Sequence, residues 1–177
     1  MGDAASKFIN IMHWNADGIQ EKLDELATSV RRWGTRIILL NETRTSAKYK
    51  IRIRGFSTEH LWRNNYGGVA VLMREDVPYK RLPLRDPALQ STEAVAVQLQ
   101  DDTIIIACYN SPRRKLTELE LNALFGMGRK VALVGDLNAT HPAWNKVALV
   151  GDLNATHPAW NCSRSNPNGN KPANSLT

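Results

Sequence analysis

The chain of 177 residues is 42% hydrophobic and carries a formal net charge of +6. This length suggests one domain with a substantial core, and no apolar stretch approaches the length of a membrane-spanning helix. Two cysteines, Cys108 and Cys162, are too few for a disulfide framework and favour a reducing, intracellular compartment. The positive charge favours a polyanionic partner, with nucleic acid the first candidate.

The first part of the chain is predicted to form a strand, a helix and a second strand. The strands are expected at residues 8–14 and 36–41, the second of them wholly buried. Between them, apolar side chains at spacings of three and four fall on one helical stripe: Ile19, Leu23, Leu26, Val30 and Trp33. Asp17 with Gln20 resembles a capping box, and Gly34 suits the end of the helix. A strand–helix–strand unit implies that the two strands are parallel neighbours.

Residues 48–54 alternate strictly between basic and apolar side chains, which predicts a strand. One face carries Lys48, Lys50, Arg52 and Arg54, and the other carries Tyr49, Ile51 and Ile53. The basic face is either simply solvated or in contact with phosphates, and the sequence favours neither interpretation.

Further strands are expected at residues 66–73, 92–99 and 103–108. Pro78, Pro83 and Pro87 mark an extended connection between the first two of these strands. Arg113 and Arg114 follow the third strand and are two more candidates for contact with nucleic acid.

A second helix is predicted from Thr117, where Glu120 completes a capping box. Leu116 and Leu121 lie at the positions of a hydrophobic staple, which packs a residue before the helix against one in its first turns.

The sixteen residues 130–145 are repeated without a change as residues 146–161. Each copy contains an apolar strand that runs into a glycine, an acid and then an amide, which are Asp136 and Asn138 in the first copy and Asp152 and Asn154 in the second. A fold has one place for such a strand, and we expect the first copy to occupy it. The polar segments 1–6 and 162–177 are expected to be disordered.

Several predicted strands end in polar residues of related chemistry. Asn15, Glu42, Tyr109, Asp136 and Asn138 all come at or just after an apolar strand. In α/β sheets, ligands bind beyond the carboxyl ends of strands, so these groups are expected to meet in one crevice. Carboxylate and amide oxygens suit Mg²⁺ or Mn²⁺, and a phenol and amides can stabilise charge on phosphate oxygens. The set therefore predicts metal-assisted hydrolysis of phosphodiesters.

Three of these residues, and Asp17 and His141 near them in the sequence, also have a purely structural interpretation. Asp17 is better explained as a helix cap than as a metal ligand. Glu42 can be a solvated strand end, Tyr109 a core residue and Asn138 a turn residue. His141 is better explained by a structural turn than by a role as a catalytic base.

Four motifs in this order resemble those of the endonuclease/exonuclease/phosphatase superfamily. They are Trp14-Asn15-Ala-Asp17-Gly18, Leu40-Asn-Glu42-Thr43, the segment at Tyr109, and Gly135-Asp136-Leu-Asn138-Ala139. Residues 135–144 and 67–69 are most similar to the apurinic-type endonuclease domain of jockey-like non-LTR retrotransposons. The resemblance covers roughly residues 7–145 and, through the repeat, extends to about residue 170.

The resemblance implies an α/β fold of the DNase I-like type, a four-layer sandwich of two mixed β-sheets flanked by helices. It implies that Glu42, helped by Asn15, binds the metal and that Asp136 orients or activates water. Asn138 and Tyr109 would contact the scissile phosphate, with Asp152 and Asn154 as the equivalents in the second copy. The family closes with a Ser-Asp-His motif, and nothing similar follows Asn161. We therefore expect an incomplete domain over residues 7–161, truncated at its C-terminus, with little turnover.

The resulting hypothesis is an endonuclease that nicks DNA so that a retrotransposon can prime reverse transcription. Its partners would be DNA and the reverse transcriptase domain of the parent element, with no membrane. It would act in the nucleus and otherwise be cytoplasmic. The alternatives are a repair-type abasic-site endonuclease and a catalytically dead remnant that only binds DNA.

Overall fold

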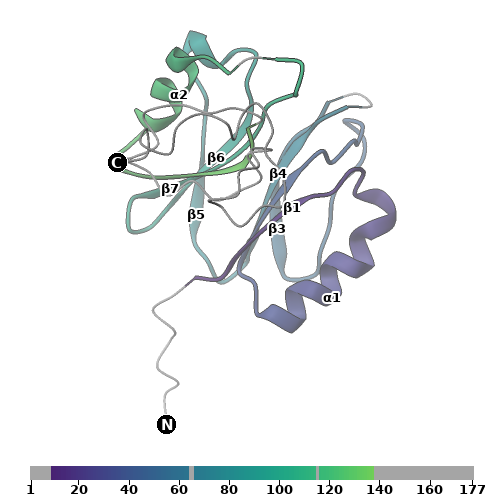
Figure 1. The fold of residues 1–177 in the computed structure, drawn as a ribbon. Coiled ribbons are helices and arrows are strands. Elements are labelled where there is room, and N and C mark those ends of the chain that lie inside the picture. Colours follow the sequence, from purple (N-terminus) through teal and green to yellow (C-terminus); the bar gives the residue numbers. More distant parts are fainter. Residues whose placement is uncertain (1–8, 64–65, 115, 138–177) are drawn as a thin grey trace, which may run out of the picture.

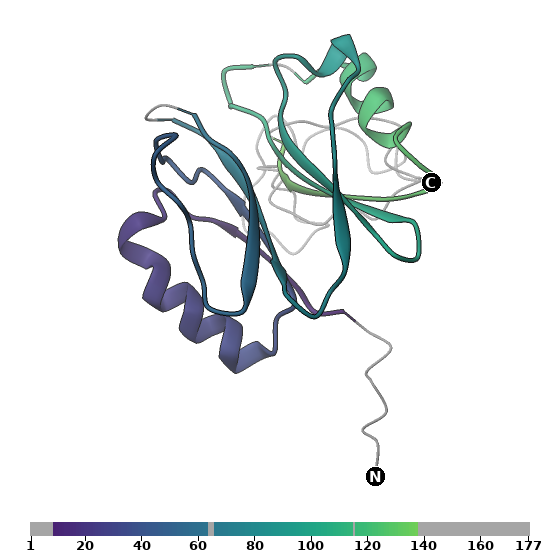
Figure 2. The ribbon, with the colours of Figure 1, turned by 180° about the vertical axis from the view of Figure 1, so that it is seen from behind.

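Four layers of secondary structure make up the described part of the chain (Figure 1). The structure is a computed structural model, and it describes residues 9–63, 66–114 and 116–137. Two four-stranded sheets pack face to face, and one helix covers the outer side of each (Figures 1 and 2). None of the helices in these residues is long and apolar enough to cross a membrane.

The first sheet has the order β1-β2-β4-β3. Its strands are β1 (Ile11–Asn15), β2 (Ile37–Asn41), β3 (Phe56–Leu61) and β4 (Val69–Arg74). β1 and β2 are parallel and are joined by a short 3-10 helix (Gln20–Lys22) and α1 (Leu23–Trp33), as predicted, whereas the other pairs are antiparallel.

The second sheet has the order β5-β6-β7-β8. Its strands are β5 (Tyr79–Leu82), β6 (Glu93–Leu99), β7 (Thr103–Tyr109) and β8 (Lys130–Asp136). A 3-10 turn (Pro87–Leu89) precedes β6, and α2 (Glu118–Phe125) joins the parallel strands β7 and β8. The first copy of the repeat thus provides β8, whereas residues 146–161 and the tail lie outside the described residues.

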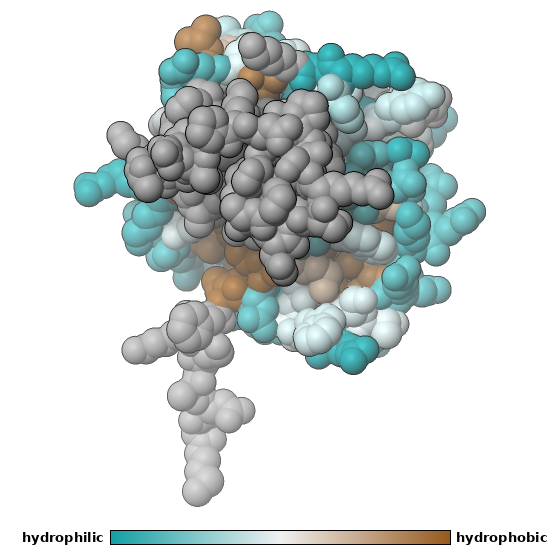
Figure 3. All heavy atoms as spheres, viewed as in Figure 1, coloured by the Kyte–Doolittle hydropathy of each residue, from teal (hydrophilic) through white to brown (hydrophobic). Residues whose placement is uncertain are grey.

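The surface is mixed, and hydrophobic residues gather beside the start of β1 (Figure 3). Ile9 and Ile11 are 38% and 45% exposed there, and with Ile37 and Ile105 they line a groove of about 500 Å³. This groove lies at the opposite end of β1 and β7 from the polar residues that follow these strands.

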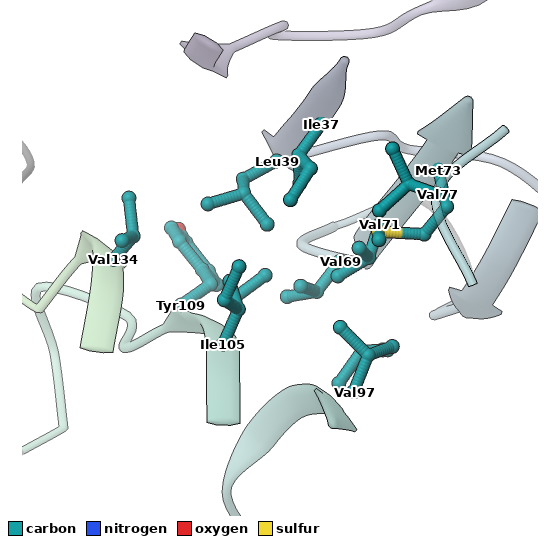
Figure 4. Close-up of a cluster of buried hydrophobic side chains, with 12 residues drawn as sticks. Ile37, Leu39, Val69, Val71, Met73, Val77, Val97, Ile105, Tyr109 and Val134 are labelled. Atoms are coloured by element: carbon teal, nitrogen blue, oxygen red, sulfur yellow. The ribbon is translucent and has the colours of Figure 1, made fainter. Parts of the chain in front are cut away.

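Three hydrophobic clusters fill the three spaces between the four layers. Ile37 and Leu39 of β2 face the second sheet (Figure 4), while Ile38 and Leu40 face α1. Because both faces of β2 are covered, the strand is apolar from Ile37 to Leu40 rather than alternating. The four-layer sandwich of two mixed sheets is confirmed.

The start of the first helix differs from its prediction. Asp17 does not cap it, because its φ of 43° lies in the left-handed region and α1 begins after the 3-10 turn without a side-chain cap. Gly34 does end the helix, with φ 58° and its N–H donating to Val30 O. Trp33, expected on the buried stripe, is 62% exposed.

The strand predicted at residues 48–54 is wrong, although its two faces are correct. The segment is extended but belongs to neither sheet. Ile51 and Ile53 are buried against the α1 side of the first sheet, and Lys48, Lys50, Arg52 and Arg54 are exposed. Burial of alternate side chains therefore produced the pattern without a ladder of backbone hydrogen bonds.

Two strands were missed, β3 and β5. Both lie at sheet edges and are half-buried or exposed along their length, so their sequences, FSTEHL and YKRL, lack a continuous apolar run. Pro78 and Pro83 flank β5, which is why the segment was predicted to be only an extended connection.

The start of α2 is as predicted. Thr117 Oγ1 accepts from the Glu120 N–H, and the Glu120 carboxylate accepts from the Thr117 N–H. Leu116 and Leu121, the expected staple, are 6% and 1% exposed in the same cluster.

Gly135 allows β8 to approach β7 closely just before Asp136. Its φ is 153°, and a Cβ at this position would lie 1.7 Å from Cys108 O. We therefore expect Gly135→Ala to lower the free energy of unfolding by roughly 2–5 kcal/mol in urea denaturation. Gly151→Ala makes the same change in the second copy and should have little effect. Equal losses in the two variants would contradict the placement of the first copy in the sheet.

Candidate active site

Strands from both sheets bring their polar ends to one rim of the sandwich. Asn15 ends β1 beside Asn41 of β2, and Tyr109 ends β7 beside Asp136 of β8. Glu42 follows Asn41 directly. Parallel pairing within each sheet and face-to-face packing of the two sheets therefore gather groups that lie far apart in sequence.

The Asn15 amide joins the two acids of the rim. Its Nδ2 donates to Glu42 Oε1 at 2.9 Å and, more distantly, to Asp136 Oδ2 at 3.5 Å. Its Oδ1 accepts from the backbone N–H of Asp17 at 3.2 Å. Glu42 directly follows β2 of the first sheet and Asp136 ends β8 of the second, so one side chain of β1 links acids from both halves of the sandwich.

The backbone around Glu42 is strained. Asp17, Glu42 and Arg44 have φ values of 43°, 49° and 47°, which L-residues rarely adopt. Hydrogen bonds across the rim hold these conformations: Gly18 N donates to Glu42 O and Arg44 N donates to Gly67 O, both at 2.9 Å. Such strain is often found at functional sites, and here it turns the Glu42 side chain toward the rim.

Arg44 is a member of the site that the sequence analysis missed. Its Nη2 lies 2.7 Å from Glu42 Oε2 and 2.5 Å from Asp17 Oδ1. Burial alone would raise the pKa of Glu42, but hydrogen bonds from Asn15, Arg44 and Tyr109 and the Arg44 charge outweigh it and lower that pKa. Glu42 is therefore an anion at neutral pH. Asp17 forms an ion pair with Arg44 and does not cap the helix.

Tyr109 is both a core residue and a member of the rim. It is 9% exposed and belongs to the cluster between the sheets (Figure 4). Burial, followed by the charges of Glu42, Asp136 and Glu93, raises its pKa to about 12. The hydroxyl consequently keeps its proton at neutral pH and can donate a hydrogen bond.

A buried polar contact supports the rim from below. Asn41 is fully buried, and its Nδ2 donates to Cys108 O at 2.7 Å while its Oδ1 lies 2.8 Å from His13 Nε2. Because Cys108 is in β7, this contact ties the two sheets together one residue before Glu42 and one before Tyr109. Asn41 was not predicted from the sequence, because its amide resembles that of any other polar residue at the end of a strand.

The two arginines after β7 have different environments. Arg114 donates to Asn110 Oδ1 and Ser91 Oγ, both at 2.9 Å, and pairs with Glu120. Arg113 is exposed and lines the pocket at the rim. Contact with nucleic acid stays a prediction for both, but the Arg114 guanidinium already has protein partners.

Glu120 anchors this arginine and the start of α2. Burial would raise its pKa, but hydrogen bonds from Thr117, Thr92 and Arg114 lower it to about 2. A lowered pKa means that the stabilisation is complete above pH 4.5 and is lost as the pH falls toward 2. We expect Glu120→Gln to lower the free energy of unfolding at pH 7 by roughly 2–3 kcal/mol and to flatten its dependence on pH below 4.5.

Urea denaturation between pH 2 and pH 7 tests this expectation. Glu118→Gln is the matched control, because Glu118 lies in the same first turn of α2 and is exposed. If the free energy of unfolding of both variants falls in acid as it does in the parent chain, protonation of Glu120 is not the cause of that fall.

A pocket of about 360 Å³ opens at the rim. Its lining includes Glu42, Arg44, Tyr66, Glu93, Tyr109 and Arg113. Glu93, at the start of β6, was also missed. It accepts from Gly68 N at 2.8 Å and lies 3.6 Å from Arg63 Nε, so it positions the backbone before β4.

The donor set of the rim suits a hard divalent cation. Within residues 9–63, 66–114 and 116–137, no three His, Cys, Asp or Glu side chains cluster as a metal site. Mg²⁺, however, typically binds one or two carboxylates and retains several waters. Glu42 and Asp136 are two such carboxylates. The Asn15 amide would present an oxygen to the ion after a half-turn that gives up its hydrogen bond from the Asp17 N–H, so these residues fit the ion.

Four of the predicted site residues are thus brought together, namely Asn15, Glu42, Tyr109 and Asp136. Asn138, Asp152 and Asn154 lie outside the described residues.

Two mixed sheets packed between helices, with acids, amides and a phenol at one rim, define a DNase I-like α/β fold. The chain belongs to the Endonuclease/Exonuclease/phosphatase family, whose model matches residues 12–175. The recognition of this family from the sequence motifs is confirmed.

Similar proteins include retrotransposon polypeptides and DNA-processing enzymes. The chain is 29% identical over 110 residues to a probable RNA-directed DNA polymerase from transposon X-element of Drosophila melanogaster. That match covers 59% of this chain and 12% of the Drosophila protein. The endonuclease domain of TRAS1, a telomere-specific non-LTR retrotransposon, superposes with a TM-score of 0.60 at 16% identity, covering 96% of this chain and 69% of that one. The 3′ phosphatase NExo from Neisseria, bound to a product DNA hairpin, gives 0.57 at 21% identity, covering 78% and 60%.

Proposed function

We propose that this chain is the endonuclease domain of a non-LTR retrotransposon and hydrolyses DNA phosphodiesters with Mg²⁺ or Mn²⁺. The observation that carries the proposal is the Asn15 amide, which joins Glu42 of one sheet to Asp136 of the other. Membership of the family and the similarity to the TRAS1 endonuclease domain support it.

Each residue of the rim has a role in this proposal. Glu42 and Asn15 would hold the cation, with the negative charge of Asp136 beside it, and the cation when bound would polarise the scissile phosphate and neutralise its developing charge. Asp136, a buried carboxylate, accepts the proton of the attacking water. Tyr109 keeps its proton and donates a hydrogen bond to a phosphate oxygen. Asn138, assigned by resemblance, would contact the same phosphate.

In the parent element, the nick would expose a DNA end from which reverse transcription starts. The protein partner would then be the element's own reverse transcriptase domain, and the site of action would be the nucleus. The Drosophila relative, whose name describes an RNA-directed DNA polymerase, supports the proposed reverse transcriptase partner.

Nicking of a supercoiled plasmid tests the proposal, with protein in excess over DNA so that slow cleavage is detected. We expect nicked circles with Mg²⁺ or Mn²⁺ but neither with EDTA nor with Glu42→Ala. Nicking that survives EDTA or the loss of Glu42 would overturn the proposal. Preference for a duplex with an abasic site over an intact one would indicate the repair-type enzyme, and DNA binding without cleavage the inactive remnant.

A further inference from the structure

A second groove lies beside edge strand β3, apart from the pocket at the rim. It has a volume of about 440 Å³ and is formed by β3, by the extended segment that contains Lys50 and Arg52, and by Arg81 of β5. Its lining shares no residue with that of the active-site pocket. The proposed chemistry at the rim does not use this groove.

Cationic side chains outnumber acidic ones in the groove. Lys50 and Arg52 are exposed and lie on the same side of their segment, because Ile51 between them is buried. Arg81 contributes a third cation, and its Nη1 lies 3.1 Å from Glu59 Oε2, the acid of the groove. Three cations against one acid leave the groove positive, which favours a polyanion.

Aromatic side chains lie among these cations. Trp62, at the end of β3, lines the groove and is 45% exposed, and Tyr49 and Phe56 also line it. An exposed indole beside cations offers a face on which a nucleic-acid base can stack while phosphates contact the cations. A base within a duplex does not present its face, so this combination suits an unpaired strand.

The groove and the active-site pocket are neighbours. His60 lines the groove, and its Nε2 lies 3.1 Å from Oγ1 of Thr43, the residue that follows Glu42. Trp62 lines the groove, whereas Tyr66, four residues further along and 79% exposed, lines the pocket. The connection between β3 and β4 therefore contributes one exposed aromatic residue to each site, Trp62 to the groove and Tyr66 to the pocket.

We propose that this groove binds single-stranded nucleic acid, with bases stacked on Trp62 and phosphates on Lys50 and Arg52. The proposal rests on the proposed function in that the partner is a polynucleotide. It adds a site for the unpaired strand beside the site of cleavage.

The same residue types also occur on α1, which contributes no residue to this groove, and they provide a matched control. Arg31 and Arg32 lie in the last turn of α1. The Cζ atom of Arg32 lies 5.3 Å from the ring centre of Trp33, which is 62% exposed. If positive charge and an exposed indole were enough, this surface would bind as well as the groove does.

Fluorescence anisotropy with labelled single strands of about 12 nucleotides tests the proposal. EDTA is present, so that binding is measured without cleavage and independently of the proposed nuclease activity. Oligo(dT) and oligo(U) distinguish DNA from RNA, and a duplex is the third arm. The variants are Trp62→Ala and the pair Lys50→Gln with Arg52→Gln, against Trp33→Ala and the pair Arg31→Gln with Arg32→Gln.

We expect Trp62→Ala to weaken single-strand binding by a factor of about 5–100, and Trp62→Phe to restore most of it. The double charge variant should lower the slope of log K against log salt by about 1.4, which corresponds to two phosphate contacts on a single strand. The controls on α1 should change neither quantity. Three results would overturn the proposal, whatever the nicking assay shows. They are no binding of single strands, equal losses of affinity in the groove and control variants, or an effect of Trp62→Ala on duplex binding alone.

Discussion

Plasmid nicking should slow by a factor of about 10²–10⁴ when Asp136 is replaced by Asn, because the group proposed to accept a proton from water is lost. Asp136 ends β8, is 4% exposed and lies 3.5 Å from the Asn15 amide nitrogen. Asn has nearly the same shape, so the packing around the site is retained.

The repeat provides the control for this experiment. Asp152→Asn makes the same change within the identical sequence of the second copy, and it should leave the nicking rate unchanged. Loss of activity on changing Asp152 but not Asp136 would mean that the second copy supplies the acid. If neither variant nicks more slowly than the parent chain, this carboxylate has no part in the mechanism.

Replacing Glu42 by Gln should abolish detectable nicking and weaken Mn²⁺ binding, with a loss of about 10²-fold or more in rate. Glu42 is the acid that the first sheet contributes to the rim, and its lowered pKa keeps it charged in mildly acidic solution. In the parent chain its contribution to Mn²⁺ binding should therefore persist at pH 5 and disappear only in stronger acid.

Calorimetric titration with Mn²⁺ measures this effect without depending on turnover. Glu75→Gln removes an exposed acid next to the far end of β4 and should bind Mn²⁺ as the parent chain does. Equal affinities for the parent chain and Glu42→Gln would show that the ion, if bound, lies elsewhere.

Much of the fold could be predicted because its central strands are buried on both faces. β2, β6 and β7 consist largely of apolar runs, so their sequences alone indicate that they are buried. The second helix was equally clear, since Thr117 and Glu120 satisfy each other's backbone N–H groups within four residues.

The errors arose where local patterns depend on the rest of the molecule. Residues 48–54 alternate in burial without pairing in a sheet, and β3 and β5 lack a buried face of their own. Asp17 has the chemistry of a helix cap, but an ion pair with Arg44 and a left-handed backbone replace that role.

The site was predictable as a set of strand ends but not in its connections. Asn15, Glu42, Tyr109 and Asp136 each follow an apolar run, and this signal is local. Arg44 and Glu93 are recognisable only when several turns are seen together, because Arg44 pairs with Asp17 after β1 and Glu93 accepts from Gly68 N before β4.

The most direct test of the account is a double-mutant cycle for Mn²⁺ affinity with Glu42→Gln, Asp136→Asn and the two combined. If both carboxylates act on one ion, each single change weakens binding, and the combined loss differs from the sum of the two by about 0.5–3 kcal/mol. Strictly additive losses, or a single variant that binds Mn²⁺ as tightly as the parent chain, would contradict a shared site.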